Sequence, residues 1–238
     1  MKISILVPVY NEEKTIGDVL QLLVDLPCEK EIIVVDDRST DGTREILGKK
    51  FPGGKNGISV YYHEVNKGKG GAIRTALSRA TGEYVIVQDA DMEYSPAEIT
   101  KLVSVAVKTG ASAVFGSRFL STWKATSLPH YMVNWFLTFL TNVMFGASLT
   151  DMETCYKMVR TDILKDMDIR SNGFEFEPEV TAKLLLRGVK IREVPISYRG
   201  RGYDEGKKIT WRDGVSTVLA LFKYRIAGGS KRTIDHRP

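Results

Sequence analysis

The residues whose types and spacing most directly suggest chemistry are two carboxylates, Asp89 and Asp91, which are separated by Ala90. They closely follow the apolar run Tyr84–Val87, and alternate residues of an extended segment point to the same side. Both carboxylates can therefore converge where the strand ends. Two hard oxygen ligands suit Mg2+ or Mn2+, which complete their coordination with water and a substrate diphosphate. Because the same tripeptide also occurs in solvated turns, its interpretation as a transferase-like metal site depends on the surrounding motifs.

Two other apolar runs are also followed by polar residues at their carboxyl ends. The run Ile3–Val9 gives way to polar residues that can open a helix, and the run Ile32–Val35 ends in Asp36 and Asp37. Open α/β sheets bind ligands outside the carboxyl ends of their strands. The sequence therefore predicts one shared binding edge for all three segments.

In their order and spacing, these motifs resemble those of family 2 glycosyltransferases of the GT-A fold, in the branch of dolichol-phosphate mannose synthase. The resemblance extends from Ile3 to about Arg225. Many relatives in this branch carry transmembrane helices after the catalytic domain, and we expect this chain to lack them. The motifs that carry the resemblance are Pro8-Val9-Tyr10-Asn11-Glu12, Val35-Asp36-Asp37, Asp89-Ala90-Asp91, Gly116-Ser117-Arg118 and Val194-Pro195-Ile196-Ser197-Tyr198.

The order of apolar segments predicts the scaffold that positions these motifs. Strand and helix patterns alternate up to Arg118, which predicts an α/β fold: a Rossmann-like, mostly parallel central sheet with helices on both faces. The expected strands are 2–9, 31–36, 58–64, 83–88 and 111–116, and the expected helices are 13–26, 43–50, 71–79 and 96–108. Later in the chain we expect an aromatic helix at about 131–145, a short segment at 155–159, a helix at 176–187 and a strand at 190–194.

We expect one GT-A domain over residues 1–225, with a donor-binding part at about 1–118, an acceptor-side part at about 119–225 and a basic tail at 226–238. The 238 residues can bury a substantial core, and 43% apolar and 26% charged residues exclude an intrinsically disordered chain. Cys28 and Cys155 lack metal-site spacing, which favours a reduced intracellular protein. The net charge of +5 is by itself compatible with a merely basic soluble protein.

The resemblance implies a site for a nucleotide sugar and a divalent cation. Asp89 and Asp91, together with Glu93, would bind Mg2+ or Mn2+. A loop that contains Arg201 and Lys207 would close over the donor diphosphate. The residues that match the family's nucleotide-sugar positions are Pro8, Tyr10, Glu12, Val35, Asp37, Lys69, Asp89, Ala90, Asp91, Arg201 and Lys207.

Several of these residues have a simpler interpretation that the sequence leaves open. Tyr10 could belong to the core, and Asp37 could cap a helix. The glycine-rich stretch Asn66–Ala72 precedes a helix, so it could bring backbone N–H groups and Lys69 near phosphate, or be a plain helix start.

On the acceptor side, Arg118 matches an arginine that faces the acceptor phosphate in the family, and with Asp91 it is an expected catalytic residue. The planar guanidinium fits phosphate well, although a structural salt bridge is the alternative. Relatives usually have a second basic residue where this chain has Tyr131, and His130 is our candidate for its replacement. Glu93 is also a departure, because glutamine is frequent there in relatives.

The resemblance implies an inverting transfer of a hexose, of mannose or glucose type, from a GDP- or UDP-sugar to a polyprenyl or dolichyl phosphate. A phosphate acceptor is already anionic and needs no general base. We expect a peripheral enzyme at the cytoplasmic face of the membrane, because aromatic residues in 131–145 and basic residues near the C-terminus favour the lipid interface. A membrane-anchoring partner subunit is a further expectation.

Two alternatives remain at this point. The same fold could glycosylate a saccharide or another hydroxyl acceptor, a reaction that needs a general base, for which Glu177 and Glu179 are the candidates. A non-catalytic nucleotide-sugar or nucleic-acid binder is supported only by the basic charge. We expect no nucleic-acid partner, because the sequence contains no RNA-binding motif.

Overall fold

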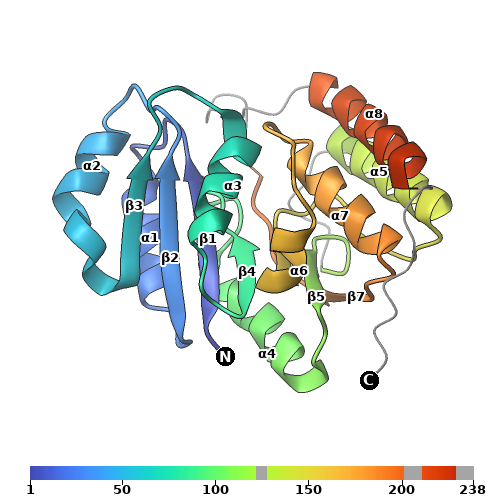
Figure 1. The fold of residues 1–238 in the computed structure, drawn as a ribbon, viewed down its shortest axis with the longest axis horizontal. Helices are drawn as coiled ribbons and strands as arrows, with labels where there is room; N and C mark the ends of the chain where they lie inside the picture. The colour runs from blue at the N-terminus through green and yellow to red at the C-terminus, as the bar shows by residue number, and fades with distance from the viewer. Residues whose placement is uncertain (122–127, 201–210, 229–238) are drawn as a thin grey trace.

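The central feature of the fold is a mostly parallel sheet, as the sequence predicted. The computed structural model describes residues 1–121, 128–200 and 211–228, and within these residues seven strands form one sheet in the order β3-β2-β1-β4-β6-β5-β7 (Figure 1). β6 runs antiparallel to both of its neighbours, and the other neighbouring pairs are parallel. The strands are β1 (Ile3–Val9), β2 (Lys30–Asp36), β3 (Ile58–Tyr62), β4 (Tyr84–Val87), β5 (Ala113–Ser117), β6 (Lys157–Arg160) and β7 (Ile191–Pro195).

Helices cover both faces of this sheet. The α-helices of the described residues are α1 (Ile16–Val24), α2 (Thr43–Lys50), α3 (Gly68–Arg79), α4 (Ile99–Thr109), α5 (Leu128–Phe145), α6 (Thr161–Asp166), α7 (Phe176–Leu186) and α8 (Trp211–Gly228). In the view of Figure 1, α3 lies in front of the sheet and α1 lies behind it. Short 3-10 turns, η1 (Pro52–Gly57) and η2 (Pro96–Glu98), precede β3 and α4. None of the helices in the described parts of the chain is long and apolar enough to cross a membrane.

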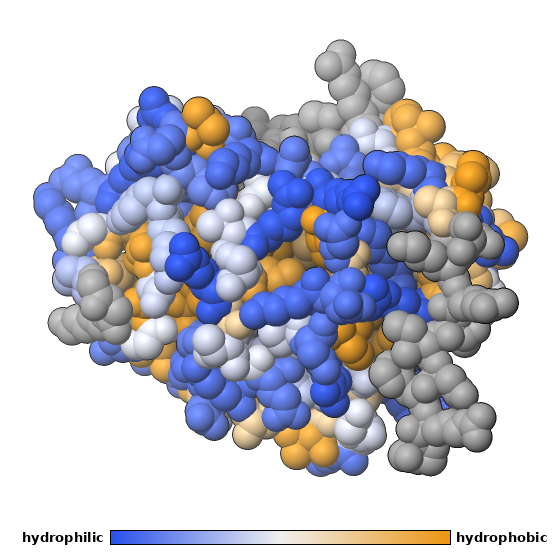
Figure 2. Space-filling model, in the orientation of Figure 1, coloured by the Kyte–Doolittle hydropathy of each residue, from blue (hydrophilic) through white to orange (hydrophobic). Residues whose placement is uncertain are grey.

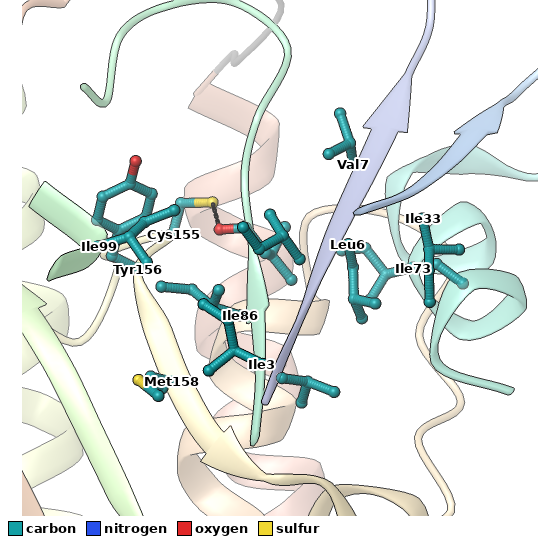
Figure 3. Close-up of a cluster of buried hydrophobic side chains, with 14 of the residues drawn as sticks. Ile3, Leu6, Val7, Ile33, Ile73, Ile86, Ile99, Cys155, Tyr156 and Met158 are labelled. Carbon is teal, nitrogen blue, oxygen red and sulfur yellow. Dashed lines mark hydrogen bonds between the residues drawn. The ribbon is translucent and has the colours of Figure 1, made fainter. Parts of the chain in front are cut away.

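The main core surrounds β1, which lies between β2 and β4 and is buried along almost its whole length. A strand covered on both faces has an almost continuous apolar sequence, which explains the run Ile3–Val9. Figure 3 shows Leu6 of β1 close to Ile33 and Ile73, which come from β2 and α3. A second, smaller hydrophobic cluster joins α5, α7 and α8. Its buried members are Leu137, Met152, Ala182, Ala220, Leu221 and Tyr224.

The structure corrects several boundaries and adds elements that the sequence analysis did not assign. α3 begins at Gly68 instead of residue 71, α5 begins at Leu128 instead of residue 131, and the expected helix at 96–108 divides into η2 and α4. The helices α6 and α8 had not been expected. α8 packs against α5 and α7, so its stability depends on tertiary contacts that a local sequence pattern reveals only weakly.

Candidate active site

The carboxyl ends of β1, β2 and β4 meet at one edge of the sheet and hold most of the predicted donor-site residues there. The Thr15 hydroxyl oxygen lies within hydrogen-bond distance of two acceptors, the Ala90 carbonyl at 2.7 Å and Glu12 Oε2 at 3.1 Å. This hydroxyl joins the segment after β1 to the segment after β4. Tyr10 is 39% exposed at the same edge, so it is not a core residue. The edge that the sequence predicted from three separate strand ends therefore exists as one surface.

Asp89 forms an ion pair at the centre of this edge. The Lys69 Nζ lies 2.8 Å from Asp89 Oδ1 and 2.9 Å from Oδ2. Burial disfavours the charged ammonium, but Asp89, Cys155 and Glu177 outweigh it and raise the pKa of Lys69 well above its usual value. Lys69 thus extends into the predicted site as a cation, and its immediate partner is a predicted metal ligand.

Asp91 and Glu93 follow Asp89 at the end of β4. The Glu93 N–H donates to Asp91 Oδ1 at 3.1 Å, and the Tyr198 hydroxyl donates to Glu93 Oε2 at 2.7 Å. In the described residues, no group of three His, Cys, Asp or Glu side chains is arranged to hold a metal ion. The donor set fits Mg2+ or Mn2+ only as a partial site, because these ions bind through one or two carboxylates and complete their shell with phosphate oxygens and water.

Asp37 is a buried helix cap, which was the simpler of its two interpretations. Its carboxylate accepts hydrogen bonds from the N–H groups of Lys67 at 2.8 Å and Gly68 at 2.7 Å, and Oδ1 lies 2.7 Å from His63 Nδ1. These contacts explain why α3 starts at Gly68. They also show that these two amides of the glycine-rich stretch bind Asp37 and are not free to bind phosphate.

The glycines of this stretch have a packing function. A Cβ on Gly70 would lie 2.4 Å from the Ser171 carbonyl oxygen, so only glycine lets α3 approach that backbone. Two further predicted donor residues present little side-chain surface at this edge. Val35 is 0% exposed within the main core, and Pro8 is half-buried in β1.

Arg118 forms a two-point ion pair with Asp151. Its Nε donates to Asp151 Oδ2 and its Nη2 donates to Oδ1, both at 2.7 Å, and its guanidinium lies 5.2 Å from the centre of the Tyr198 ring. Burial disfavours the cation, but Asp151 dominates and raises the pKa of Arg118 above its usual value. The structural salt bridge therefore exists. Within the described residues no hydrogen bond involves Nη1, so one edge of the guanidinium remains available to an anion.

Of the two proposed bases, Glu179 is held in a structural network. Its carboxylate accepts hydrogen bonds from Lys183 Nζ at 2.6 Å and from the Ser171 N–H at 2.7 Å, among other donors. Burial alone would raise the pKa of Glu179, but these hydrogen bonds lower it. A carboxylate stabilised in this way is a weak proton acceptor.

Glu177 and Glu153 are different, because each keeps a buried oxygen without a hydrogen-bond partner in the described part of the chain. Glu177 Oε2 accepts a hydrogen bond from Lys157 Nζ at 2.6 Å, whereas its Oε1 accepts no hydrogen bond and lies 3.6 Å from Lys69 Nζ. Glu153 was not identified from the sequence. Burial, assisted by Glu177 and Asp151 and opposed by Lys157 and Arg118, raises the pKa of Glu153 to about 7. The signal that could have revealed Glu153 is a charged residue inside a short segment that the fold must bury.

The comparison with known families identifies the family of this chain. Residues 4–168, more than half of the chain, match the sequence model described as Glycosyl transferase family 2. The chain belongs to this family. It is therefore a nucleotide-sugar glycosyltransferase, as the motifs predicted.

Full-length relatives agree with this assignment. An undecaprenyl-phosphate mannosyltransferase from Micrococcus luteus is 31% identical over 216 residues, which cover 87% of this chain and 87% of that protein. A dolichol-phosphate mannosyltransferase from Pyrococcus furiosus is 27% identical over 240 residues, which cover 94% of this chain and 64% of that protein.

The similarity to solved structures identifies the fold of this glycosyltransferase as GT-A. Glucosyl-3-phosphoglycerate synthase from Mycobacterium tuberculosis, solved with Mn2+, uridine diphosphate and glucosyl-3-phosphoglycerate, has a TM-score of 0.71 at 20% identity. The match covers 99% of this chain and 81% of that one. At this identity the similarity establishes the architecture alone.

Some predicted residues of this glycosyltransferase cannot be placed. Arg201, Lys207 and the tail at 229–238 lie outside the described residues. For His130 the structure describes the helical backbone of α5 but not the side chain. The proposed lid and the second acceptor-phosphate cation therefore remain predictions.

Proposed function

We propose that this glycosyltransferase transfers a hexose from a GDP- or UDP-sugar to a polyprenyl phosphate, within one catalytic domain over residues 1–225. The observation that carries the proposal is the position of Tyr198 between the two predicted half-sites. Its ring stacks against the Arg118 guanidinium, and its hydroxyl binds Glu93, whose N–H binds Asp91. A cation suited to an acceptor phosphate therefore lies beside the carboxylates suited to a donor diphosphate. The names of two relatives support the same acceptor class.

In the proposed reaction, Asp89 and Asp91 would hold Mg2+ or Mn2+, which would neutralise the diphosphate of the donor. An oxygen of the acceptor phosphate attacks the anomeric carbon, the bond from that carbon to the diphosphate oxygen breaks, and the configuration inverts. The acceptor is already anionic, so no proton has to be removed from it. Lys69, with Arg201 and Lys207 as proposed lid residues, adds positive charge near the leaving group. Arg118 aligns the acceptor, with His130 as the candidate second cation.

A hydroxyl acceptor is the second candidate function, and Glu153 is the observation that favours it. Such an acceptor must lose a proton, and a carboxyl whose pKa lies near 7 can take it at neutral pH. Glu153 replaces Glu177 and Glu179 as our candidate base, because both of those carboxylates are engaged by lysines.

The acceptor test needs a variant that keeps the fold intact. Arg118→Ala would leave the fully buried Asp151 without its partner, at a cost of about 3–5 kcal/mol, so a loss of activity would be ambiguous. Arg118→Lys keeps the charge but loses the planar fork of donors. Arg170→Lys is the matched control, because Arg170 pairs with Asp168 at the exposed surface.

The assay starts from GDP- and UDP-hexoses with Mn2+ and compares a short polyprenyl phosphate with saccharide acceptors. We expect Arg118→Lys to reduce transfer to the polyprenyl phosphate by about tenfold or more, with a change of less than about twofold in donor affinity. Arg170→Lys should match the wild type. Equal losses of donor affinity and transfer would move Arg118 to the donor side. Transfer to saccharides alone would replace the proposal with the hydroxyl-acceptor function.

We further propose that the enzyme is peripheral at the cytoplasmic face of a membrane. α5 and α8 lie side by side and expose apolar side chains along their outer faces, visible as orange atoms at the upper right of Figure 2. Trp135 and Phe139 of α5 are each more than half exposed, and Ile226 of α8 is 78% exposed. Aromatic and aliphatic side chains of this kind favour a lipid interface, and the neighbouring Lys223 and Arg225 favour anionic headgroups.

Sedimentation with anionic liposomes tests this location. The wild type should pellet at low salt and be partly released at high salt. The double variant Trp135→Ser and Phe139→Ser should bind more weakly, whereas Val107→Ser on the exposed face of α4 should not. If the wild type ignores anionic liposomes at low salt, direct membrane attachment is wrong, and a membrane-anchoring partner subunit becomes the explanation to test.

A further inference from the structure

Lys69 lies between the partly exposed carboxylate of Asp89 and the buried carboxylate of Glu177, but it forms hydrogen bonds with only Asp89. Its Nζ is 2.8 Å from Asp89 Oδ1 and 3.6 Å from Glu177 Oε1. Glu177 Oε1 is buried and has no hydrogen-bond partner within the described ranges of the chain. The ammonium therefore forms hydrogen bonds with Asp89 and a longer ion pair, without a hydrogen bond, with Glu177.

Contacts of the other carboxylate oxygen hold Glu177 in place, so that Oε1 faces Lys69. Its other oxygen, Oε2, accepts a hydrogen bond from Lys157 Nζ at 2.6 Å, and Lys157 also donates to the Thr154 carbonyl and lies over the Phe115 ring. Glu177 itself lies in the first turn of α7. A buried carboxylate oxygen without a hydrogen bond is costly, so its presence requires a reason.

The surroundings of Lys69 restrict where its ammonium can move. The Phe174 ring centre is 5.7 Å away and the Cys155 Sγ is 4.0 Å away, on segments that also border Glu177. Besides Asp89, Glu177 is the carboxylate paired with Lys69 in the part of the chain that the structure describes. A short shift of Nζ away from Asp89 therefore leads to Glu177 Oε1.

We propose that Lys69 changes its partner when a divalent cation binds Asp89. Its ammonium then moves from Asp89 to Glu177. Both Asp89 oxygens are within hydrogen-bond distance of Lys69. A divalent cation on Asp89 repels the neighbouring ammonium, and the repulsion is strong in a site with little water. Lys69 then pairs with Glu177 Oε1, so each charge keeps a partner in both states. Glu177 is thus a positioning residue for metal binding.

This inference rests on the proposed metal role of Asp89, but it does not depend on the identity of the acceptor. It gives a reason why Glu177 Oε1 is buried beside Lys69 without a hydrogen bond. It also gives the glycine-rich start of α3 a function, since the turn that Asp37 caps holds Lys69 within reach of both carboxylates.

A double-mutant cycle on metal affinity tests the inference without an activity assay. The free Mn2+ signal in electron paramagnetic resonance gives the affinity of the protein for Mn2+, alone and with saturating GDP or UDP. The variants are Lys69→Met, Glu177→Gln and their combination. Glu179→Gln is the matched control, because Glu179 lies on the same helix and pairs with Lys183 instead of Lys69. Circular dichroism confirms folding, and Lys69→Gln replaces Lys69→Met if the latter does not fold.

We expect Glu177→Gln to weaken Mn2+ binding about tenfold, because Lys69 then has no alternative partner and competes for Asp89. Lys69→Met should strengthen the binding of Mn2+ alone, and adding Glu177→Gln to it should change the affinity less than about twofold. An equal loss in both backgrounds, or weaker binding in Lys69→Met, would overturn the inference and leave the metal role of Asp89 intact. A wild type that binds no Mn2+ even with nucleotide would overturn both proposals.

Discussion

The two ends of the parallel sheet carry carboxylates of opposite character. At the amino end, Glu31 accepts hydrogen bonds from the hydroxyl and N–H of Thr81, from the Ser4 hydroxyl, from Lys2 and from the Gly82 N–H. These bonds join the starts of β1 and β2 to the residues just before β4. Burial alone would raise the pKa of Glu31, but the hydrogen bonds lower it from 4.5 to about 2. This carboxylate is fully paired and ties the scaffold together.

At the carboxyl end, charges are packed together but incompletely paired. Glu153 and Glu177 each keep a buried oxygen without a hydrogen bond in the described residues, and Lys69 holds Asp89. Unsatisfied buried polar groups are rare in native proteins and concentrate where function requires them. The comparison indicates that paired carboxylates add stability at the amino end of the sheet, whereas incompletely paired ones lower it at the carboxyl end, where we propose that the ligand binds.

The largest effect should come from Asp91 at the carboxyl end. We expect Asp91→Asn to lower the rate of hexose transfer by about 100-fold or more, because a neutral amide holds a divalent cation and its diphosphate more weakly. The melting temperature should stay within a few degrees of the wild type. The measurement is the initial transfer rate at saturating Mn2+, with thermal unfolding followed in parallel. Near-normal turnover, or full wild-type activity in excess chelator, would contradict the assignment of catalysis to the carboxyl end of the sheet.

Glu31→Gln should give the opposite result to Asp91→Asn, namely lower stability with activity retained. The amide can no longer accept all of the donors around it, so we expect a loss of about 2 kcal/mol in the free energy of unfolding at pH 7 with activity retained. Because folding lowers the pKa of Glu31, its contribution is complete above about pH 4.5 and is lost as the pH falls toward 2. Urea unfolding at several pH values measures this. A constant difference between variant and wild type down to pH 2 would show that ionisation of Glu31 is not the cause.

The last predicted effect is a gain in stability. Glu153 is neutral in the folded protein up to about pH 7, so its ionisation costs stability between its usual pKa of 4.5 and about 7. We expect Glu153→Gln to match the wild type below pH 4.5 and to exceed it by up to about 3 kcal/mol above pH 7. Thermal melts at pH 4.5 and pH 8 provide the comparison. A destabilised variant at pH 8 would mean that the Glu153 carboxylate is paired, and it would remove Glu153 as a candidate base.

Much of the scaffold was predictable because local patterns determine it. The runs Ile3–Val9 and Ile32–Val35 are continuous and apolar because their strands are covered on both faces, and polar residues at their ends mark the binding edge. Asp89 and Asp91 could be placed at that edge from the sequence. The sequence analysis did not predict α8, because its helical state depends on packing against α5 and α7.

The sequence by itself determined which residue types gather at the carboxyl edge, since strand direction and the order of motifs depend on local periodicity. Only the tertiary structure decided which charges pair. Asp37 caps α3, Arg118 pairs with Asp151 across 33 positions, and Lys69 lies between Asp89 and Glu177. Such partners come from distant segments, and their energies depend on burial and on distances of a few ångströms. The order of residues along the chain does not contain those distances before the chain has folded.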